Sequence, residues 1–323
     1  MMKRVLLLLL LISLLTGCRK SAPPEEVQDI ALPLVDEAVH TSQAHPLYWN
    51  QKEQEYIDQL RSEGILKITT RIRESVYEPD KYGEGLHGGL DYELISSFAE
   101  LIGVDLDVEL VDTFSLYFAH DGRVPDDAIQ QSLVSGESPA YIPDSFQNSL
   151  ILIDGFSWKD WRDPLAQFVP TFPDRDVVIT RSYSGVSSLE DLKGKNLGIH
   201  PQANPSRYLV EALERNEIPV DTMVIESVDE LPAALFRNEV DAVAIGGISS
   251  LFEMKHYSGL EIAFPVGQSL SWSHWLVQKD NLILAGILEK YILYAKDKGV
   301  ISEAWERQFH FSYNDFLYII TMD

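Results

Sequence analysis

The sequence is poor in cysteine, in positive charge and in long apolar runs. Its 323 residues include a single cysteine, so an intrachain disulfide is excluded and a packed core has to stabilise the fold. Lysine and arginine total 26 against 50 aspartates and glutamates, a formal net charge of −24. Nucleic acids and anionic lipid headgroups attract basic patches, so this balance argues against both as electrostatic partners. A solvated acidic surface explains the charge, and a cationic ligand or partner is the alternative.

The usual signatures of catalysis and metal binding are also missing from the sequence. The eight histidines show no spacing typical of metal ligands. No glycine-rich phosphate loop is found, and no set of nucleophile, base and orienting residue. We therefore expect no metal and no cofactor. What the sequence does contain is 45% apolar and 10% aromatic residues, over a length sufficient for two lobes.

The first 17 residues are typical of a secretory signal. A cationic start at residues 1–4 precedes an apolar run at residues 5–15, and small residues follow. The apolar run is shorter than the ~20 residues that span a bilayer, so a transmembrane helix is not predicted. The signal ends in Leu15-Thr16-Gly17-Cys18, which resembles the lipobox of bacterial lipoproteins. A signal peptide with an incidental cysteine is the alternative.

The lipobox resemblance implies that Cys18 is lipidated, with diacylglycerol and palmitate, and becomes the mature N-terminus. Several acyl chains give durable anchoring where a single chain gives only marginal binding. In enterobacterial lipoproteins an aspartate after the cysteine retains the protein at the inner membrane, and Arg19 stands there instead. We therefore expect a periplasmic protein held to the membrane by lipid on Cys18, with the outer membrane favoured.

The rest of the chain divides into a tether, two lobes and a tail. Prolines punctuate a weakly patterned stretch at residues 18–50, which predicts a tether. We assign residues 51–172 and 275–310 to lobe 1, residues 173–274 to lobe 2 and residues 311–323 to a C-terminal tail. In lobe 2, strands and helices alternate regularly, as is typical of a mostly parallel, doubly wound sheet.

Lobe 1 is less regular than lobe 2. Its first half indicates a strand at residues 65–70, a helix ending at Gly103, and a strand at residues 104–110 in which apolar and acidic residues alternate. Residues 111–148 show no clear period, although a helix is expected over residues 126–134. Site residues in this segment cannot be predicted from the pattern.

Five short motifs occur in the order typical of type 2 periplasmic solute-binding proteins, the family 3 solute-binding proteins. They are Gly64–Thr70, Gly88–Leu94, Leu189–Lys195, Val240–Val243 and Lys298–Trp305. The resemblance implies an α/β fold of two lobes, each a doubly wound mixed sheet. The lobes of such proteins close on a ligand by a hinge motion, and the hinge strands are expected near residues 171–176 and 270–275.

A narrower resemblance concerns cell-wall enzymes. Leu66–Tyr77 and Gly89–Leu94 resemble the non-catalytic N-terminal module of membrane-bound lytic murein transglycosylase F. Phe309–Asp323 resembles the segment that joins that module to the catalytic domain. The Glu-Ser helix that would carry the catalytic acid is not found in this sequence. We therefore expect a binding module without enzymatic activity.

The family resemblance also implies a ligand site. Family members hold a ligand carboxylate with an arginine, whose planar guanidinium suits bidentate binding. Gly155 to Arg162 aligns with the family pattern G-x-T-x-T-x-E-R. Arg162 therefore matches the carboxylate-binding arginine, Ser157 the assisting hydroxyl, and Gly155 the start of the pattern. The alternative is a surface arginine paired with Asp160 or Asp163.

Departures from the family pattern bear on the ligand. The acid that usually holds the ligand amine is replaced by Ile245-Gly246-Gly247, and the acid that ends the first strand is replaced by Arg71. A buried ammonium without a carboxylate is costly, so an ordinary free amino acid is not favoured. The Gly246-Gly247 pair could instead leave room for something bulkier, such as a cell-wall fragment. The remaining candidate ligand-binding residues are Tyr77, Asn204 and Ser206, the last two at a helix start whose N–H groups suit an anion.

Several functions fit these patterns. The leading hypothesis is a lipid-anchored, non-catalytic solute-binding or sensor protein for an amino-acid-like ligand or muropeptide. One alternative is a transglycosylase F-related protein in peptidoglycan turnover, acting as an enzyme or as the regulatory partner of one. Another is the substrate-binding component of an ABC transporter, with a permease as its partner. A ligand-free interaction protein is a further alternative.

Overall fold

The computed structural model describes residues 47–123, 141–159, 161–201, 203–267 and 270–322. The predicted signal peptide, Cys18, most of the predicted tether and the helix expected over residues 126–134 lie outside these ranges. Within them, no helix combines the length and the apolar character needed to cross a bilayer. The lipid anchor and the tether therefore stay predictions.

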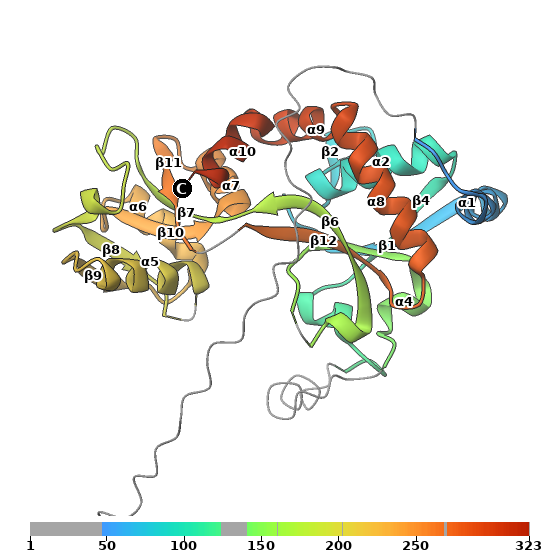
Figure 1. Cartoon of the computed structure of the whole chain (residues 1–323), viewed down its shortest axis with the longest axis horizontal. Coiled ribbons are helices and arrows are strands. Elements are labelled where there is room, and N and C mark those ends of the chain that lie inside the picture. Colours follow the sequence, from blue (N-terminus) through green and yellow to red (C-terminus); the bar gives the residue numbers. More distant parts are fainter. Residues whose placement is uncertain (1–46, 124–140, 160, 202, 268–269, 323) are drawn as a thin grey trace, which may run out of the picture. The chain divides into compact units, whose positions relative to one another are not determined.

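The first sheet has five strands in the order β4-β1-β5-β12-β6 (Figure 1). Strand β1 pairs in parallel with β4 and β5, whereas β12 runs antiparallel to β5 and β6. The strands are β1 (Ile65–Thr70), β4 (Asp105–Leu110), β5 (Ile151–Phe156), β6 (Ala166–Asp174) and β12 (Ser271–Gln278). The longer helices that contact this sheet are α1 (Gln51–Glu63), α2 (Leu90–Ile102) and α8 (Leu282–Asp297).

Local sequence sets the ends of the first two helices. Asn50 begins α1 with a capping box: its side chain accepts from the Glu53 amide, and the Glu53 carboxylate accepts from the Asn50 amide. Gly64 and Gly103 end α1 and α2, each in the left-handed region at φ +75°. These glycines direct the chain from each helix into the strand that follows.

The second sheet also has five strands, in the order β11-β7-β10-β8-β9. Strands β8, β9 and β10 are parallel, and β7 runs antiparallel to β10 and β11. The strands are β7 (Asp176–Arg181), β8 (Asn196–Ile199), β9 (Asp221–Val224), β10 (Ala242–Gly246) and β11 (Leu260–Pro265). Their helices are α5 (Asn204–Arg215), α6 (Leu231–Phe236) and α7 (Gly247–His256). Two mixed sheets with helices confirm the predicted fold class.

Short elements and two C-terminal helices complete the described chain. The hairpin strands are β2 (Glu78–Gly83) and β3 (Leu86–Gly88), and the short helices are η1 (Phe114–Phe118), α4 (Ser145–Asn148), η2 (Asp163–Leu165), η3 (Glu190–Leu192) and η4 (Val228–Glu230). The last helices are α9 (Val300–Phe309) and α10 (Tyr313–Thr321). The chain passes between the two sheets at β6–β7 and again at β11–β12, near the predicted hinge strands.

Helices α9 and α10, which we call the C-terminal brace, connect the two sheets through apolar contacts. Trp305 of α9 is fully buried, with its ring centroid 6.0 Å from that of Phe172 in β6 and 4.7 Å from that of Phe309. Phe309 in turn lies 4.7 Å from Phe252 of α7. A single cluster of buried apolar side chains therefore includes residues of both sheets.

The residues predicted to form a tail contain α10, which is docked against the second sheet. Tyr313, Phe316 and Ile320 are buried, and α10 packs on α9 and β11. Arg175, between β6 and β7, donates through Nη1 to the carbonyls of Ile320 (3.2 Å) and Met322 (2.8 Å). These carbonyls at the end of a helix have no partner within the helix, so the arginine satisfies them. The boundaries assigned to the tail and lobes stay predictions.

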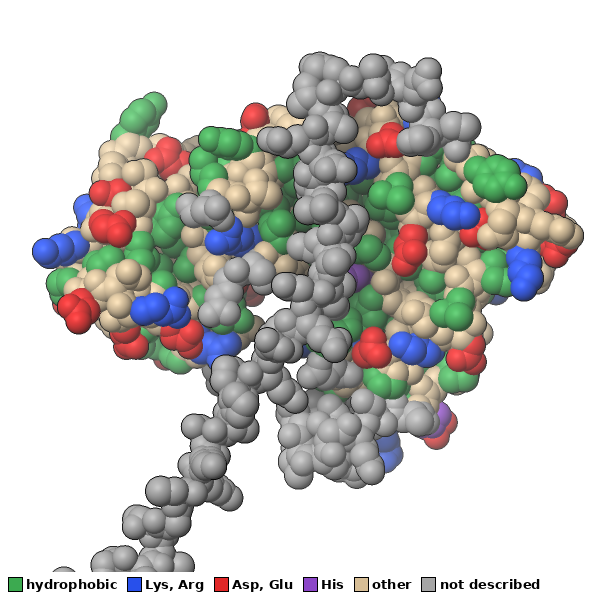
Figure 2. Space-filling view, viewed as in Figure 1, with side chains coloured by type: hydrophobic (Ala, Val, Ile, Leu, Met, Phe, Trp, Pro, Cys, Tyr) green, Lys and Arg blue, Asp and Glu red, His purple; other side chains and the backbone are tan. Residues whose placement is uncertain are grey.

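The surface agrees with the acidic composition. On the face shown in Figure 2, basic side chains lie scattered among acidic ones and do not gather into one patch. The visible side chains of this face therefore show no basic patch of the kind that nucleic-acid recognition uses.

Candidate functional site

A cavity of about 290 Å³ lies between the loop that follows β1 and the helices of the second sheet. Arg73, Glu74 and Ser75 line it from the first sheet. From the second sheet it is lined by Ala203, Pro205, Val228, Asp229, Pro232, Ala244, Ile245, Gly246, Ser249, Phe252, Glu253 and His256. Concave, partly apolar sites with a few convergent polar groups are typical of small-ligand binding.

Charges of both signs face this cavity. Arg73 supplies a guanidinium, half exposed and 3.5 Å from the buried Asp154 carboxylate. Glu253 and Asp229 supply carboxylates. Burial raises the pKa of Glu253; the charge of His256 opposes this rise, and Asp229 and Glu74 add to it. A ligand cation beside Glu253 would relieve this repulsion, and an anion would suit Arg73.

Arg71 is held by Asp154. Its Nε donates to Asp154 Oδ2 at 2.5 Å, and its guanidinium lies 5.3 Å from the Phe114 ring centroid. Burial lowers the pKa of Arg71, but the hydrogen bond and charge of Asp154 outweigh burial, and the net effect raises the pKa. Asp154 is fully buried, so removing Arg71 would leave its carboxylate with the more distant Arg73 guanidinium, 3.5 Å away. Arg71 does not line the cavity.

Arg162 rests on aromatic rings. Its guanidinium carbon lies 5.0 Å from the ring centroids of Phe114, Phe118 and Trp161, and its Nη1 donates to the Ser157 carbonyl at 3.0 Å. Such cation–π contacts stabilise a guanidinium that is partly removed from water. Burial lowers the pKa of Arg162 to about 10.

The structure brings Ser157 and Arg162 together, and Gly155 lies near the end of strand β5, but none of the three lines the cavity. Among the described residues, Arg162 forms no ion pair with Asp163, whose carboxylate lies 3.5 Å from Lys279 Nζ. Asp160 lies outside the described residues. The role assigned to Arg162 stays a prediction.

Three other predicted residues have local structural roles. Tyr77 is buried, with its ring 5.3 Å from His87 and 5.0 Å from Tyr92. Ser206 is buried and its hydroxyl accepts from the His200 amide at 3.1 Å, which closes the turn before α5. Asn204 is exposed and accepts from Arg207. None of the three lines the cavity, whose wall at this turn is Ala203 and Pro205.

The two glycines that follow Ile245 differ in their surroundings. Gly246 lines the cavity, and a Cβ there would meet only ordinary contacts, the nearest at 3.6 Å. At Gly247 a Cβ would lie 2.6 Å from the Arg175 carbonyl oxygen and 2.7 Å from Asp174 Oδ1. Gly247 therefore permits the close approach of α7 to the hinge, and only Gly246 leaves space for a ligand.

Sequence comparison with the family did not indicate the charged residues that line the cavity. Arg73 and Glu74 follow the first strand by a few residues, and Asp229 precedes α6. On α7, however, Ser249, Glu253 and His256 recur at helical spacing and share one face, which is a signal that periodicity could have provided. From the sequence, a free amino acid was not favoured because the acid that usually holds the ligand amine is replaced. Asp229 and Glu253 supply carboxylates at the wall of the cavity instead.

One group of metal-ligand side chains occurs among the described residues. Atoms of His120, Asp121 and Asp144 lie within 4.8 Å of one another. The Asp144 carboxylate already accepts from the backbone amides of Asp121 (3.2 Å) and Gly122 (2.7 Å). His120 and Asp121 are exposed. The group is explained by closure of this turn.

Comparisons with known proteins agree with both resemblances. Residues 173–265 match the family described as NMT1/THI5 like. Over 258 residues the chain is 23% identical to membrane-bound lytic murein transglycosylase F of Stutzerimonas stutzeri (strain A1501), covering 78% of this chain and 48% of that protein. The chain thus spans about half the length of the curated relatives it matches.

Solved structures share the fold. Substrate binding domain 2 of GlnP from Lactococcus lactis, in an open conformation, gives a TM-score of 0.59 at 15% identity, covering 77% of this chain and 97% of that one. The unliganded L-cystine solute receptor of Neisseria gonorrhoeae gives 0.59 at 14% identity, covering 79% and 97%. The chain therefore has the two-lobed fold of periplasmic binding proteins, and the resemblance predicted from the motifs is confirmed.

Proposed function

We propose that this protein is a periplasmic solute-binding or sensor protein that takes a small ligand into the cavity between its two sheets. The observation that carries the proposal is the arrangement of charges around the cavity. Arg73 lies in the loop after β1, whereas Asp229 (η4) and Glu253 (α7) lie on the side of the second sheet. Glu74, beside Arg73, already contacts Lys255 and His256. A ligand that contacts both sides is held only when the lobes are close, which is how a hinged protein senses occupancy.

The ligand class follows from these charges and the size of the cavity. Arg73 suits a carboxylate, and Asp229 with Glu253 suits an ammonium. About 290 Å³ is at the small end of ligand pockets, so a compact zwitterion fits better than a long chain. An amino-acid-like compound, or the peptide part of a muropeptide, meets these requirements. The name of the curated relatives favours the cell-wall fragment.

A thermal-shift screen of the full chain with amino acids and muropeptides tests this proposal. A ligand at 100 times its Kd stabilises the folded state by about 2.7 kcal/mol and raises Tm. With the ligand found, Arg73→Gln should weaken binding about 10- to 100-fold, because a charge-assisted hydrogen bond is lost. Arg215→Gln removes the same charge from an exposed position on α5 and is the matched control.

The result for Arg162→Gln separates the two candidate arginines. Unchanged affinity supports the cavity described above. Loss of affinity in Arg162→Gln with none in Arg73→Gln would instead restore the carboxylate site predicted by the family pattern. If no ligand raises Tm, the ligand-free interaction protein becomes the better explanation.

We further propose that the protein is not an enzyme. The alternative is a role in peptidoglycan turnover like that named for the curated relatives, as an enzyme or as a regulatory partner. Incubation with purified peptidoglycan and detection of released muropeptides discriminates, and cleavage would refute the non-catalytic proposal.

The fold shared with transporter-linked binding proteins favours a second candidate, the substrate-binding component of an ABC transporter. Ligand uptake that depends on this protein would establish that role.

Lipid on Cys18 is the proposed link to the membrane, with the outer membrane favoured. Cys18→Ala should move the protein from the membrane fraction to the soluble fraction, because the acyl chains supply the anchoring. Fractionation and immunoblotting check the outcome. Continued tight membrane association of the variant would contradict lipid anchoring.

A further inference from the structure

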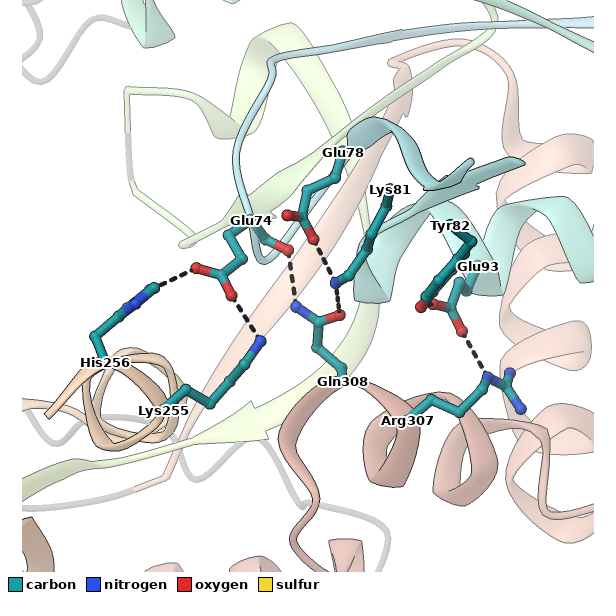
Figure 3. A network of polar contacts seen from close by, with 9 residues as sticks. All are labelled: Glu74, Glu78, Lys81, Tyr82, Glu93, Lys255, His256, Arg307 and Gln308. Carbon is teal, nitrogen blue, oxygen red and sulfur yellow. Dashed lines mark hydrogen bonds and ion pairs between the residues drawn. The ribbon is translucent and has the colours of Figure 1, made fainter. Parts of the chain in front are cut away.

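The Glu74 carboxylate, at the edge of the cavity, connects the loop after β1 of the first sheet to helix α7 of the second sheet. Glu74 lies in the loop after β1, and Lys255 and His256 end helix α7. Lys255 Nζ donates to Glu74 Oε1 at 2.6 Å, and His256 Nε2 lies 2.8 Å from Glu74 Oε2 (Figure 3). Each oxygen of the carboxylate thus has a basic group of the other lobe as its neighbour.

The backbone of Glu74 is fixed from its own side. Gln308 of α9 is buried, and its Nε2 donates to the Glu74 carbonyl at 2.9 Å. Lys81 donates to Gln308 Oε1 and pairs with Glu78, which sets the orientation of the amide (Figure 3). The carboxylate is therefore presented by an ordered turn, and less conformational entropy is lost when it meets α7.

The electrostatics of Glu74 favour the ionised state. Burial raises its pKa, but hydrogen bonds and charge from Lys255 and His256 outweigh burial and lower the pKa below its usual value. The side chain keeps about a third of its surface exposed, so solvent screens the contact. Such a contact is directional but can be broken and remade at small cost.

Glu74 and His256 both line the cavity, so their contact forms part of its wall. The C-terminal brace joins the same two lobes through a continuous cluster of buried apolar side chains. We propose that Glu74, Lys255 and His256 form a polar latch that holds the lobes together over the cavity, and that its release opens the cavity. The inference rests on the two-lobed fold and not on the identity of the ligand.

The latch is tested by measuring the distance between the lobes in the full chain without ligand. Spin labels on Gln59→Cys in α1 and Glu214→Cys in α5, both exposed, report this distance in a Cys18→Ser background. The wild-type latch should give mainly one distance. Glu74→Gln should raise the ratio of longer to shorter distances roughly fivefold, the upper range for a solvent-screened ion pair.

Glu93→Gln is the matched control. It removes the same charge from a carboxylate that contacts Arg307 (3.0 Å) and Tyr82 (2.7 Å) and does not contact α7 (Figure 3). Its distances should equal those of the unsubstituted protein. Equal distributions for Glu74→Gln and Glu93→Gln would overturn the latch.

Substitution from the other lobe checks that the effect belongs to this contact. Lys255→Gln with His256→Gln should lengthen the distances as Glu74→Gln does, and adding Glu74→Gln should lengthen them no further, because groups in one contact are not additive. Additive lengthening would indicate a general loosening and would contradict the latch. A cooperative thermal melt confirms that each variant is folded.

Discussion

Two sets of contacts join the lobes, and they differ in chemistry. The C-terminal brace buries Trp305, Phe309 and Phe316 in one apolar cluster with residues of both sheets. The latch joins Glu74 to two basic side chains at a partly exposed site. Apolar burial is non-directional and is not weakened by charge screening, whereas an exposed ion pair is weak and is screened by salt. The difference between brace and latch indicates a division of labour. The buried apolar contacts of the brace keep the lobes joined, and the weaker polar contact of the latch can open at the edge of the cavity.

The largest expected effect comes from breaking the brace. Trp305→Ala should lower the free energy of unfolding by about 3–5 kcal/mol, because it removes a fully buried ring and leaves a cavity. Chemical denaturation with the linear extrapolation checks this value. Tyr318→Ala, in α10 of the same brace but about two thirds exposed, should change stability by less than about 0.5 kcal/mol. Equal losses in both variants would contradict the brace.

A buried polar contact in the first sheet gives the next effect. Asp91 is buried, and Trp275 Nε1 donates to its Oδ1 at 2.6 Å. Burial raises the pKa of Asp91 to about 7, against the lowering effect of that hydrogen bond. Because the folded pKa lies above the unfolded one, the stability this carboxyl contributes is full below about pH 4 and is lost as pH rises through about 7.

Asp91→Asn should remove that dependence. Relative to the variant, the unsubstituted protein should lose a few kcal/mol of unfolding free energy between about pH 4 and pH 7. Urea denaturation of both proteins across this range measures the difference. A difference that stays constant with pH would refute the raised pKa.

The smallest effect is expected at the latch. Glu74→Gln should cost at most about 1 kcal/mol of unfolding free energy at low ionic strength, and the cost should shrink at about 1 M salt, where the Debye length is about 3 Å. The Trp305→Ala loss should not shrink with salt. Denaturation at two salt concentrations measures both. A latch cost that is independent of salt would remove the distinction between the two sets of contacts.

Much of the fold could be predicted from the sequence, because its signals are local. Gly103 ends a helix at the expected position, and the alternation of strands and helices predicts the second sheet. The candidate site was harder to predict because its geometry depends on distant contacts. Phe114 and Phe118, which hold Arg162, come from a segment without clear periodicity. Glu74 meets α7 across 181 positions of sequence, which no local pattern records.

The glycine pair after β10 shows the same limit. From sequence alone, Gly246 and Gly247 are equivalent, because each lacks a side chain and either could leave space for a ligand. In the structure Gly246 borders the cavity, while Gly247 is required by the nearby Asp174 carboxylate and Arg175 backbone. An absent side chain indicates ligand space only when the neighbouring atoms are known.

The continuous apolar cluster has a consequence for how the protein can be divided. A fragment of residues 173–274 would contain a complete five-stranded sheet. It would also expose Phe252 and the apolar surface of β11 that the C-terminal helices cover in the intact chain. Such a fragment should aggregate, and the intact protein should melt in one calorimetric transition, with equal van't Hoff and calorimetric enthalpies. A single transition would mean that the two lobes fold as one unit, even if they move relative to each other in the native state.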